Sequence, residues 1–243
     1  NKIGIKFLAS VFDLKSLKLV KKLNLKLIKL PSGELNNFEL VEQIAKKEHE
    51  VILSTGMASY TEIGNTIKYL RKRLKKLTVL HCISSYPTKP NQVQINNMLE
   101  IKNKFNVKVG FSDHTNGFEA AISATILGAT VIEKHLTLNR KMKGPDHSSS
   151  LNPVEFINFI KSIRNTEKLF IKKKNKITSD ELKNSKLVRK SIVAKTRIKK
   201  GEKFSRKNIT TKRPDNGISA SKWFKVLNKV AKKNFNKNEL IKL

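Results

Sequence analysis

Short apolar runs alternate with longer amphipathic stretches along most of the chain. The runs are typical of buried strands and lie at residues 5–9, 27–30, 51–54, 78–82, 107–111 and 130–134. The stretches between them carry apolar residues at helical spacing, which predicts helices over 13–23, 37–47, 59–74, 95–104 and 117–127. This regular alternation predicts an α/β fold in which helices cover a parallel sheet.

The six strand–helix units fit a (β/α)8 barrel of the TIM type that lacks its first two strands. A complete barrel has eight strands, so we expect the missing pair to precede Asn1. A further helix is predicted over 153–169, because Asn152 and Pro153 form a typical helix start. We assign residues 1–170 to this partial barrel domain.

The pattern changes after residue 170. Residues 171–186 include the Lys-rich run 172–176 and are predicted to form a solvated, flexible linker. In residues 187–243 short strands such as 191–195 alternate with turns at Gly201 and Gly217. This part is predicted to be a small β-rich domain.

The composition narrows the possible partners and compartments. The net charge is +32, but lysine supplies 43 of the 51 basic residues and is spread along the chain. No zinc-finger spacing, aromatic RNA-binding motif or arginine-rich stripe accompanies it, so we expect no nucleic-acid partner. We expect no membrane span, because no apolar run approaches about 18 residues. The single cysteine, Cys82, excludes an internal disulfide and is typical of the cytoplasm.

Polar side chains follow the predicted strands at their carboxyl ends, where α/β proteins bind ligands. Hydroxyls and a lysine there can bind phosphate, and carboxylates can bind sugar hydroxyls or move protons. His114 and His135 are one strand–helix unit apart, so their imidazoles can share a divalent metal ion. The alternative for each histidine taken alone is an N-cap or core residue.

Other residues near these strand ends have structural interpretations. We expect His81 to be a satisfied interior residue, Cys82 to be a small core residue and His49 to be exposed in a polar turn. Glu133 and Lys134 can form an inward ion pair, or Glu133 can support His135 from behind.

Several motifs together resemble one enzyme family. They are Lys29–Glu34, Val51–Met57, Ser112–Thr115, Ile132–His135 and Gly144–His147, with Lys212–Pro214 and Gly217–Ser219 near the end of the chain. In this order they resemble the sialic acid synthases (N-acetylneuraminate synthase and relatives), whose C-terminal module is an antifreeze-like SAF domain. The resemblance implies an enzyme that joins phosphoenolpyruvate to an N-acetylated amino sugar, forming a C–C bond and releasing phosphate by C–O cleavage.

The resemblance also implies roles for individual residues. His114 and His135 would hold Mn²⁺ or Mg²⁺ and act in catalysis together with Glu34. Arg213 would enter the site of the other subunit in a homodimer with exchanged SAF domains. The remaining implied contacts are to the two substrates, and they fall on Lys29, Ser32, Ser54, Ser84, Tyr86, Ser112 and Asp146.

The resemblance leaves the sugar open. N-acetylmannosamine, giving N-acetylneuraminate, is the first expectation. The alternatives are a legionaminate, pseudaminate or spore-coat polysaccharide synthase, a carbohydrate-binding protein and an inactive fragment. Family members carry their first two strands and a glutamate base in a preceding segment, so we expect no turnover from these 243 residues alone.

Overall fold

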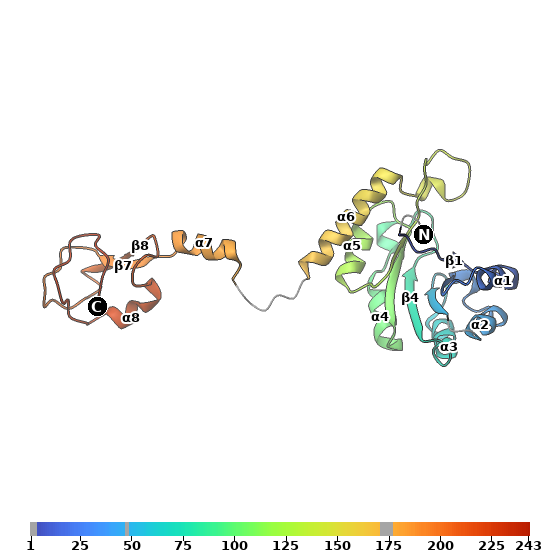
Figure 1. Cartoon of the computed structure of the whole chain (residues 1–243), viewed down its shortest axis with the longest axis horizontal. Helices are drawn as coiled ribbons and strands as arrows, with labels where there is room; N and C mark the ends of the chain where they lie inside the picture. The colour runs from blue at the N-terminus through green and yellow to red at the C-terminus, as the bar shows by residue number, and fades with distance from the viewer. Residues whose placement is uncertain (1–3, 47–48, 171–176) are drawn as a thin grey trace. The chain divides into compact units, whose positions relative to one another are not determined.

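The computed structural model describes residues 4–46, 49–170 and 177–243 (Figure 1). The chain divides into two compact units, Asn1–Ile171 and Lys172–Leu243. Each unit has its own hydrophobic core and is described by itself.

The first unit is a six-stranded parallel sheet with strands in the order β1-β2-β3-β4-β5-β6. The strands are β1 (Ala9–Ser10), β2 (Leu27–Leu30), β3 (Glu50–Ser54), β4 (Lys76–Cys82), β5 (Lys108–Asp113) and β6 (Ile132–Lys134). The helices are α1 (Leu14–Lys22), α2 (Phe38–Ala45), α3 (Tyr60–Arg71), α4 (Asn96–Phe105), α5 (Glu119–Ile126) and α6 (Pro153–Leu169). Sequential parallel strands joined by helices are the arrangement of a TIM-type barrel, so the predicted fold class is confirmed.

The helices begin where side chains cap them. Ser59 accepts a hydrogen bond from the backbone N–H of Glu62, whose side chain accepts one from the N–H of Ser59. Asn152 and Glu155 form the same reciprocal pair at the start of α6. Each pair satisfies two backbone donors that a helix start would otherwise leave without partners.

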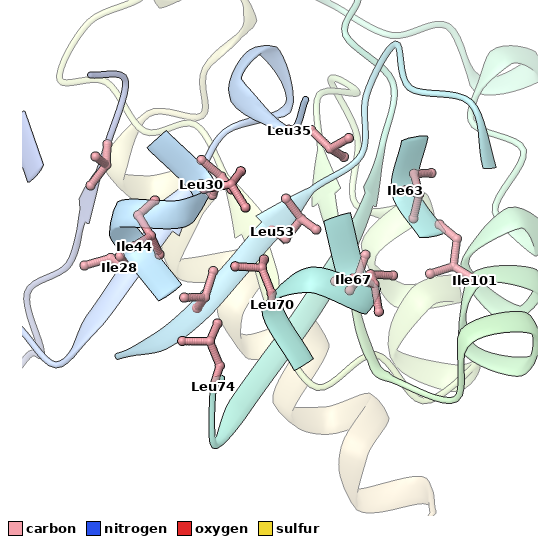
Figure 2. Close-up of a cluster of buried hydrophobic side chains, with 14 of the residues drawn as sticks. Ile28, Leu30, Leu35, Ile44, Leu53, Ile63, Ile67, Leu70, Leu74 and Ile101 are labelled. Atoms are coloured by element: carbon pink, nitrogen blue, oxygen red, sulfur yellow. The ribbon is translucent and has the colours of Figure 1, made fainter. Parts of the chain in front are cut away.

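The main core lies between the sheet and its helices (Figure 2). Ile28, Leu30 and Leu53 of the strands are fully buried there, together with Ile44 and Leu70 of the helices. Successive strand residues point to opposite faces. Lys29, between Ile28 and Leu30, therefore lies on the face away from these helices.

The first and last strands are shorter than predicted. The first was expected over 5–9, but only Ala9 and Ser10 pair with β2. Ile5 and Phe7 are 69% and 65% exposed, because β1 is an edge strand and nothing in the described part of the chain covers its outer side. The sixth, expected over 130–134, begins at Ile132.

The second unit contains a helix that the sequence reading missed. Helix α7 (Ser179–Val188) overlaps the predicted linker over residues 179–186 and ends two residues beyond it, and a capping box of Thr178 and Glu181 starts it. Residues 179–186 are therefore helical where a flexible segment was predicted, because Thr178 and Glu181 satisfy the backbone donors at the helix start. The Lys-rich run 172–176 lies outside the described residues.

A β-rich domain follows, as predicted. Strands β7 (Ser191–Ala194) and β8 (Ile209–Lys212) pair antiparallel, and α8 (Trp223–Val226) comes after them. Isolated bridges such as Ile198–Phe235 tie the remaining loops together. Ile192, Phe204 and Phe235 are fully buried in its core.

Three minor expectations are also tested. Cys82 is buried and His81 is a satisfied interior residue, since its Nε2 lies 2.8 Å from the carbonyl oxygen of Val93. The prediction that His49 is exposed was wrong, since it is 8% exposed and directly precedes β3. Among the described residues no helix is both long and apolar enough to cross a membrane.

Burial of His81 makes the stability of the first unit depend on pH. Burial lowers the pKa of His81, and the hydrogen bond to Val93 only partly opposes this. Below about pH 6.5 the unfolded chain binds a proton that the folded chain does not, so the free energy of unfolding falls as the pH drops. His81→Gln, which keeps a donor for Val93, should show a smaller fall between pH 7 and 5 in urea titrations. An equal fall in both proteins would contradict this assignment.

Candidate active site

The candidate active site lies at the carboxyl edge of the sheet, as predicted. Lys29 in β2, Ser54 at the end of β3 and Ser112 in β5 are 5%, 3% and 2% exposed. The register aligns Cys82 of β4 with Ser112, and Ser112 with Glu133 of β6. The inner face of the sheet therefore collects buried polar groups from most of its strands.

An ion pair forms the centre of this site, in which the Lys29 side chain is 7% exposed and that of Glu133 is 36% exposed. Lys29 Nζ lies 2.7 and 2.6 Å from the two carboxylate oxygens of Glu133, and Ser112 Oγ donates to Glu133 Oε1 at 2.6 Å. Burial raises the pKa of Glu133, but the charge of Lys29 and the hydrogen bonds outweigh it, so the pKa is lowered overall. Glu133 is therefore a carboxylate at neutral pH.

Glu133 is the site residue whose partner the sequence reading missed. One of its two interpretations was an ion pair with its neighbour Lys134, but Lys134 pairs with Asp113 on the opposite face. Adjacent strand residues point to opposite faces, so two neighbours in β6 cannot meet. This alternation was the signal that could have separated them.

His114 and His135 lie side by side beyond the ends of β5 and β6. Their ring centroids are 5.4 Å apart and the rings are nearly perpendicular, at 88°. The ring of Tyr86 packs against both, at 4.3 Å from His114 and 5.6 Å from His135. The predicted neighbours are thus brought together, and Tyr86 joins them.

The hydrogen bonds of His114 leave one ring nitrogen suited to a cation. Burial lowers the pKa of His114, so the ring is neutral at pH 7. Its Nδ1 lies 2.7 Å from the carbonyl oxygen of Ile83, which can only accept, so Nδ1 carries the proton. Nε2 then holds a lone pair. Ser112 Oγ lies 3.2 Å from this nitrogen. The serine donates its single hydroxyl hydrogen to Glu133 at 2.6 Å, so that hydrogen does not occupy the Nε2 lone pair.

These donors fit a divalent metal ion with open coordination positions. Neutral imidazole is a common metal ligand, and His135 Nδ1 lies 3.9 Å from the Asp146 carboxylate. Among the described residues no group of three His, Cys, Asp or Glu side chains could hold an ion. The protein would therefore supply His114 and His135 and leave further positions for substrate or water.

Three serine hydroxyls lie at or just beyond the carboxyl ends of β2, β3 and β4. Ser54 Oγ is buried and lacks a hydrogen bond of regular geometry. Ser32 Oγ and Ser84 Oγ are 3.5 Å apart. A Cβ at Gly56 would collide with the Ser84 hydroxyl and lie 3.1 Å from Cys82 Sγ, so the glycine leaves space here. The Ser54 side chain also interacts with the Cys82 thiol.

The other predicted residues lie further from this cluster or are occupied. Glu34 accepts a hydrogen bond from Asn37 Nδ2 at 2.7 Å. Asp146 is exposed and reaches only the His135 side of the site. Arg213 belongs to the second unit, where its Nε donates to the carbonyl oxygen of Val188 at 2.8 Å.

Known proteins share both parts of the chain. The model of the NeuB family matches residues 1–176, and that of the SAF domain matches residues 189–243. The N,N′-diacetyllegionaminic acid synthase of Campylobacter jejuni is 45% identical over 245 residues, covering 100% of this chain and 73% of the relative. The human N-acetylneuraminate-9-phosphate synthase is 31% identical, covering 87% of this chain and 59% of its own length.

Solved structures agree with the sequence comparisons. The N-acetylneuraminic acid synthetase of Leptospira borgpetersenii, crystallised with citrate, superimposes with a TM-score of 0.69 at 31% identity. The match covers 75% of this chain and 64% of that one. Sequence, fold and the motifs at the strand ends thus agree, and the chain belongs to the NeuB family, with a SAF domain at residues 189–243.

Proposed function

We propose that this chain carries the phosphoenolpyruvate and metal sites of a synthase that makes a nonulosonic acid, a nine-carbon sugar acid. The reaction joins phosphoenolpyruvate to an N-acetylated amino sugar and releases phosphate. One observation carries the proposal: the Lys29–Glu133–Ser112 cluster lies beside the His114–His135 pair at one sheet edge. The Lys29 cluster would bind the anionic phosphoenolpyruvate, and a cation held by the histidine pair would bind the aldehyde oxygen of the sugar.

The chain's own residues would bind and orient phosphoenolpyruvate. Lys29 provides a buried positive charge, and Ser54 provides a hydroxyl that lacks a regular hydrogen bond. Ser32, Ser84 and Ser112 add hydroxyls around the same space. Holding the enol carbon in line with its acceptor supplies the orientation part of the rate enhancement.

The histidine side of the site would receive the sugar. A bound divalent ion supplies Lewis-acid polarisation of a carbonyl oxygen. His114 stays neutral through burial and keeps its Nε2 lone pair directed away from Ile83. Asp146 and Glu34 are the carboxylates available for sugar hydroxyls.

The relatives favour one sugar acid over another. The 45% identity to a diacetyllegionaminic acid synthase supports an N-acetylated diamino sugar as the substrate. N-acetylmannosamine, the first expectation from the sequence, is the second candidate. The 31% identity to a human N-acetylneuraminate-9-phosphate synthase supports the same broad chemistry with a different sugar.

A direct assay tests this proposal. The chain, preceded by the amino-terminal segment that the resemblance implies, is given phosphoenolpyruvate, Mn²⁺ and either sugar. We expect phosphate release and a nonulosonic acid by mass spectrometry, with higher kcat/KM for the diamino sugar. A protein that binds neither substrate would overturn the proposal, and a preference for N-acetylmannosamine would restore the first expectation.

Lys29 should affect one substrate selectively. In the same extended protein, Lys29→Ala should raise the KM for phosphoenolpyruvate by about 10-fold or more, since a hydrogen bond to a charged group contributes about 1.5–3 kcal/mol. The KM for the sugar should change much less. Lys76→Ala, at the exposed start of β4, is the matched control. Equal effects on both substrates would indicate a structural lysine.

We further propose that Arg213 acts in the site of a second subunit in a homodimer. Its guanidinium suits bidentate recognition of carboxylate or sugar oxygens. Mixing Arg213→Ala protein with His135→Ala protein should then restore partial activity, because some mixed dimers would carry one intact composite site. No recovery in a mixture shown to exchange subunits would contradict this arrangement.

A further inference from the structure

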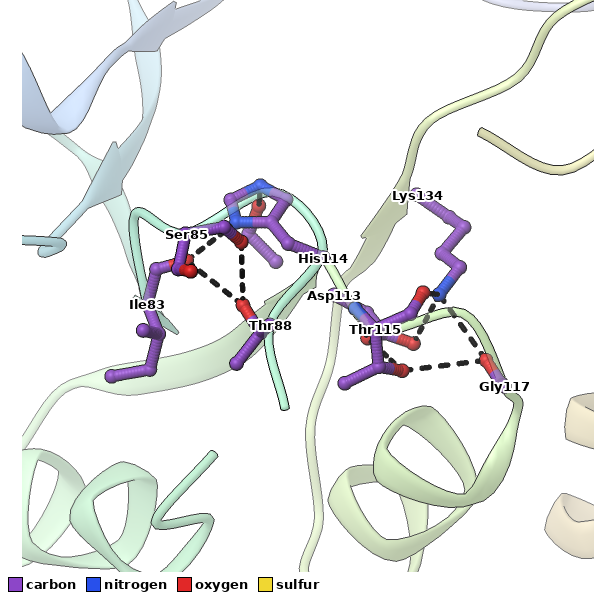
Figure 3. A network of polar contacts seen from close by, with 9 residues as sticks. Ile83, Ser85, Thr88, Asp113, His114, Thr115, Gly117 and Lys134 are labelled. Atoms are coloured by element: carbon purple, nitrogen blue, oxygen red, sulfur yellow. Dashed lines mark hydrogen bonds and ion pairs between the residues drawn. The ribbon is translucent and has the colours of Figure 1, made fainter. Parts of the chain in front are cut away.

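A buried ion pair, Lys134 with Asp113, joins the carboxyl ends of β5 and β6 (Figure 3). Lys134 Nζ lies 2.9 Å from Asp113 Oδ2, and the two side chains are 1% and 0% exposed. The ammonium also lies 5.8 Å from the ring centre of Phe159 in α6. This pair takes no part in the proposed substrate contacts, so its presence needs its own explanation.

The pair fixes the turn that carries His114. Lys134 donates to the carbonyl oxygens of Thr115 and Gly117, the latter at 3.2 Å. Asp113 Oδ1 accepts from both the backbone N–H and the hydroxyl of Thr115, each at 2.8 Å. Lys134 of β6 thus bonds to the turn after β5 both directly and through Asp113.

The position of the pair relative to the sheet is equally specific. The backbone ladder between β5 and β6 ends with Asp113 opposite Lys134. His114 and His135 are the next residues in each strand, so they lie just beyond the last ladder pair. The Lys134 side chain continues the connection between the two strands where the ladder stops.

Stability alone is a poor reason to keep such a pair. Burying each ion costs several kcal/mol, and a hydrophobic pair of similar volume is often as stable or more so. The charged pair adds directional hydrogen bonds, because the ammonium donates to Asp113 and to the carbonyl oxygens of Thr115 and Gly117. A hydrophobic pair would fill the space without fixing the turn.

We propose that Lys134 is a positioning residue that sets the separation of the His114 and His135 imidazoles. Through that separation it tunes the affinity of the site for a divalent ion. The second statement rests on the proposed function, whereas the first concerns the metal-free protein. His114 itself is also held at its main chain, where Thr88 N–H donates to its carbonyl oxygen at 2.9 Å.

The test removes both charges together, so that no unpaired ion stays buried. In the double variant Asp113→Asn with Lys134→Met, the asparagine keeps an acceptor for Thr115 while the donors to the turn are lost. We expect Mn²⁺ affinity, measured by calorimetry, to fall about 10- to 100-fold, as is typical when the support of a metal ligand is removed. The nuclear Overhauser contact between the two imidazoles should be lost without metal.

A matched control carries similar changes at the opposite end of the sheet. Glu50→Gln with Lys76→Met removes an exposed ion pair at the starts of β3 and β4 and should leave both readouts unchanged. Asp113→Asn with Lys134→Gln is a milder second variant in case the first does not fold. Its shorter donor cannot reach all three acceptors, so a smaller loss of affinity is expected.

The outcomes separate the two proposals. Wild-type Mn²⁺ affinity and an intact contact between the imidazoles in either folded double variant would overturn the role of Lys134. Equal Mn²⁺ binding by wild type and His135→Ala would instead overturn the metal site of the proposed function. In that case the contact between the imidazoles still tests the positioning role in the metal-free protein.

Discussion

The Lys29–Glu133 ion pair joins β2 to β6 with nitrogen–oxygen distances of 2.6 and 2.7 Å. These strands are four positions apart in the sheet. In a flat sheet, with about 4.8 Å between neighbours, they would be separated by about 19 Å. Direct contact therefore requires the strong curvature of a barrel wall. The inner face that this curvature creates carries Lys29, Ser112 and Glu133, and Ser112 Oγ lies 3.2 Å from His114 Nε2.

The alternation of side chains along each strand assigns the polar residues to two layers. Glu133 and Ser112 face inward, where they meet Lys29. Lys134 and Asp113, one residue further on, face the helices. The inner layer provides chemistry that a ligand can reach, and the outer layer holds the strand ends in place. Each histidine directly follows one member of the outer pair, and Ser112 of the inner layer lies 3.2 Å from His114 Nε2.

Much of this organisation could be predicted from the sequence, because local signals determine it. Apolar runs located β2 to β6 and met β1 only at Ala9, and Asn152 with Pro153 marked the start of α6. The contacts of Glu133 could not be predicted in the same way. Its partner Lys29 is 104 residues away, and their meeting depends on the curvature of the whole sheet. The start of helix α7 is also marked by a local signal, the capping box of Thr178 and Glu181, although the sequence prediction placed a flexible linker there.

The pairing of Lys29 has a consequence for how an anion would enter the site. Although the chain carries a net charge of +32, the buried ammonium at this site is already neutralised by Glu133. An incoming carboxylate or phosphate would have to replace the glutamate as the partner of Lys29, or share it. Binding would then be an exchange of counterions at the buried Lys29, whose present partner Glu133 is 36% exposed. The positive net charge would attract anions from a distance. Competition with Glu133 for Lys29 would then determine which anions bind.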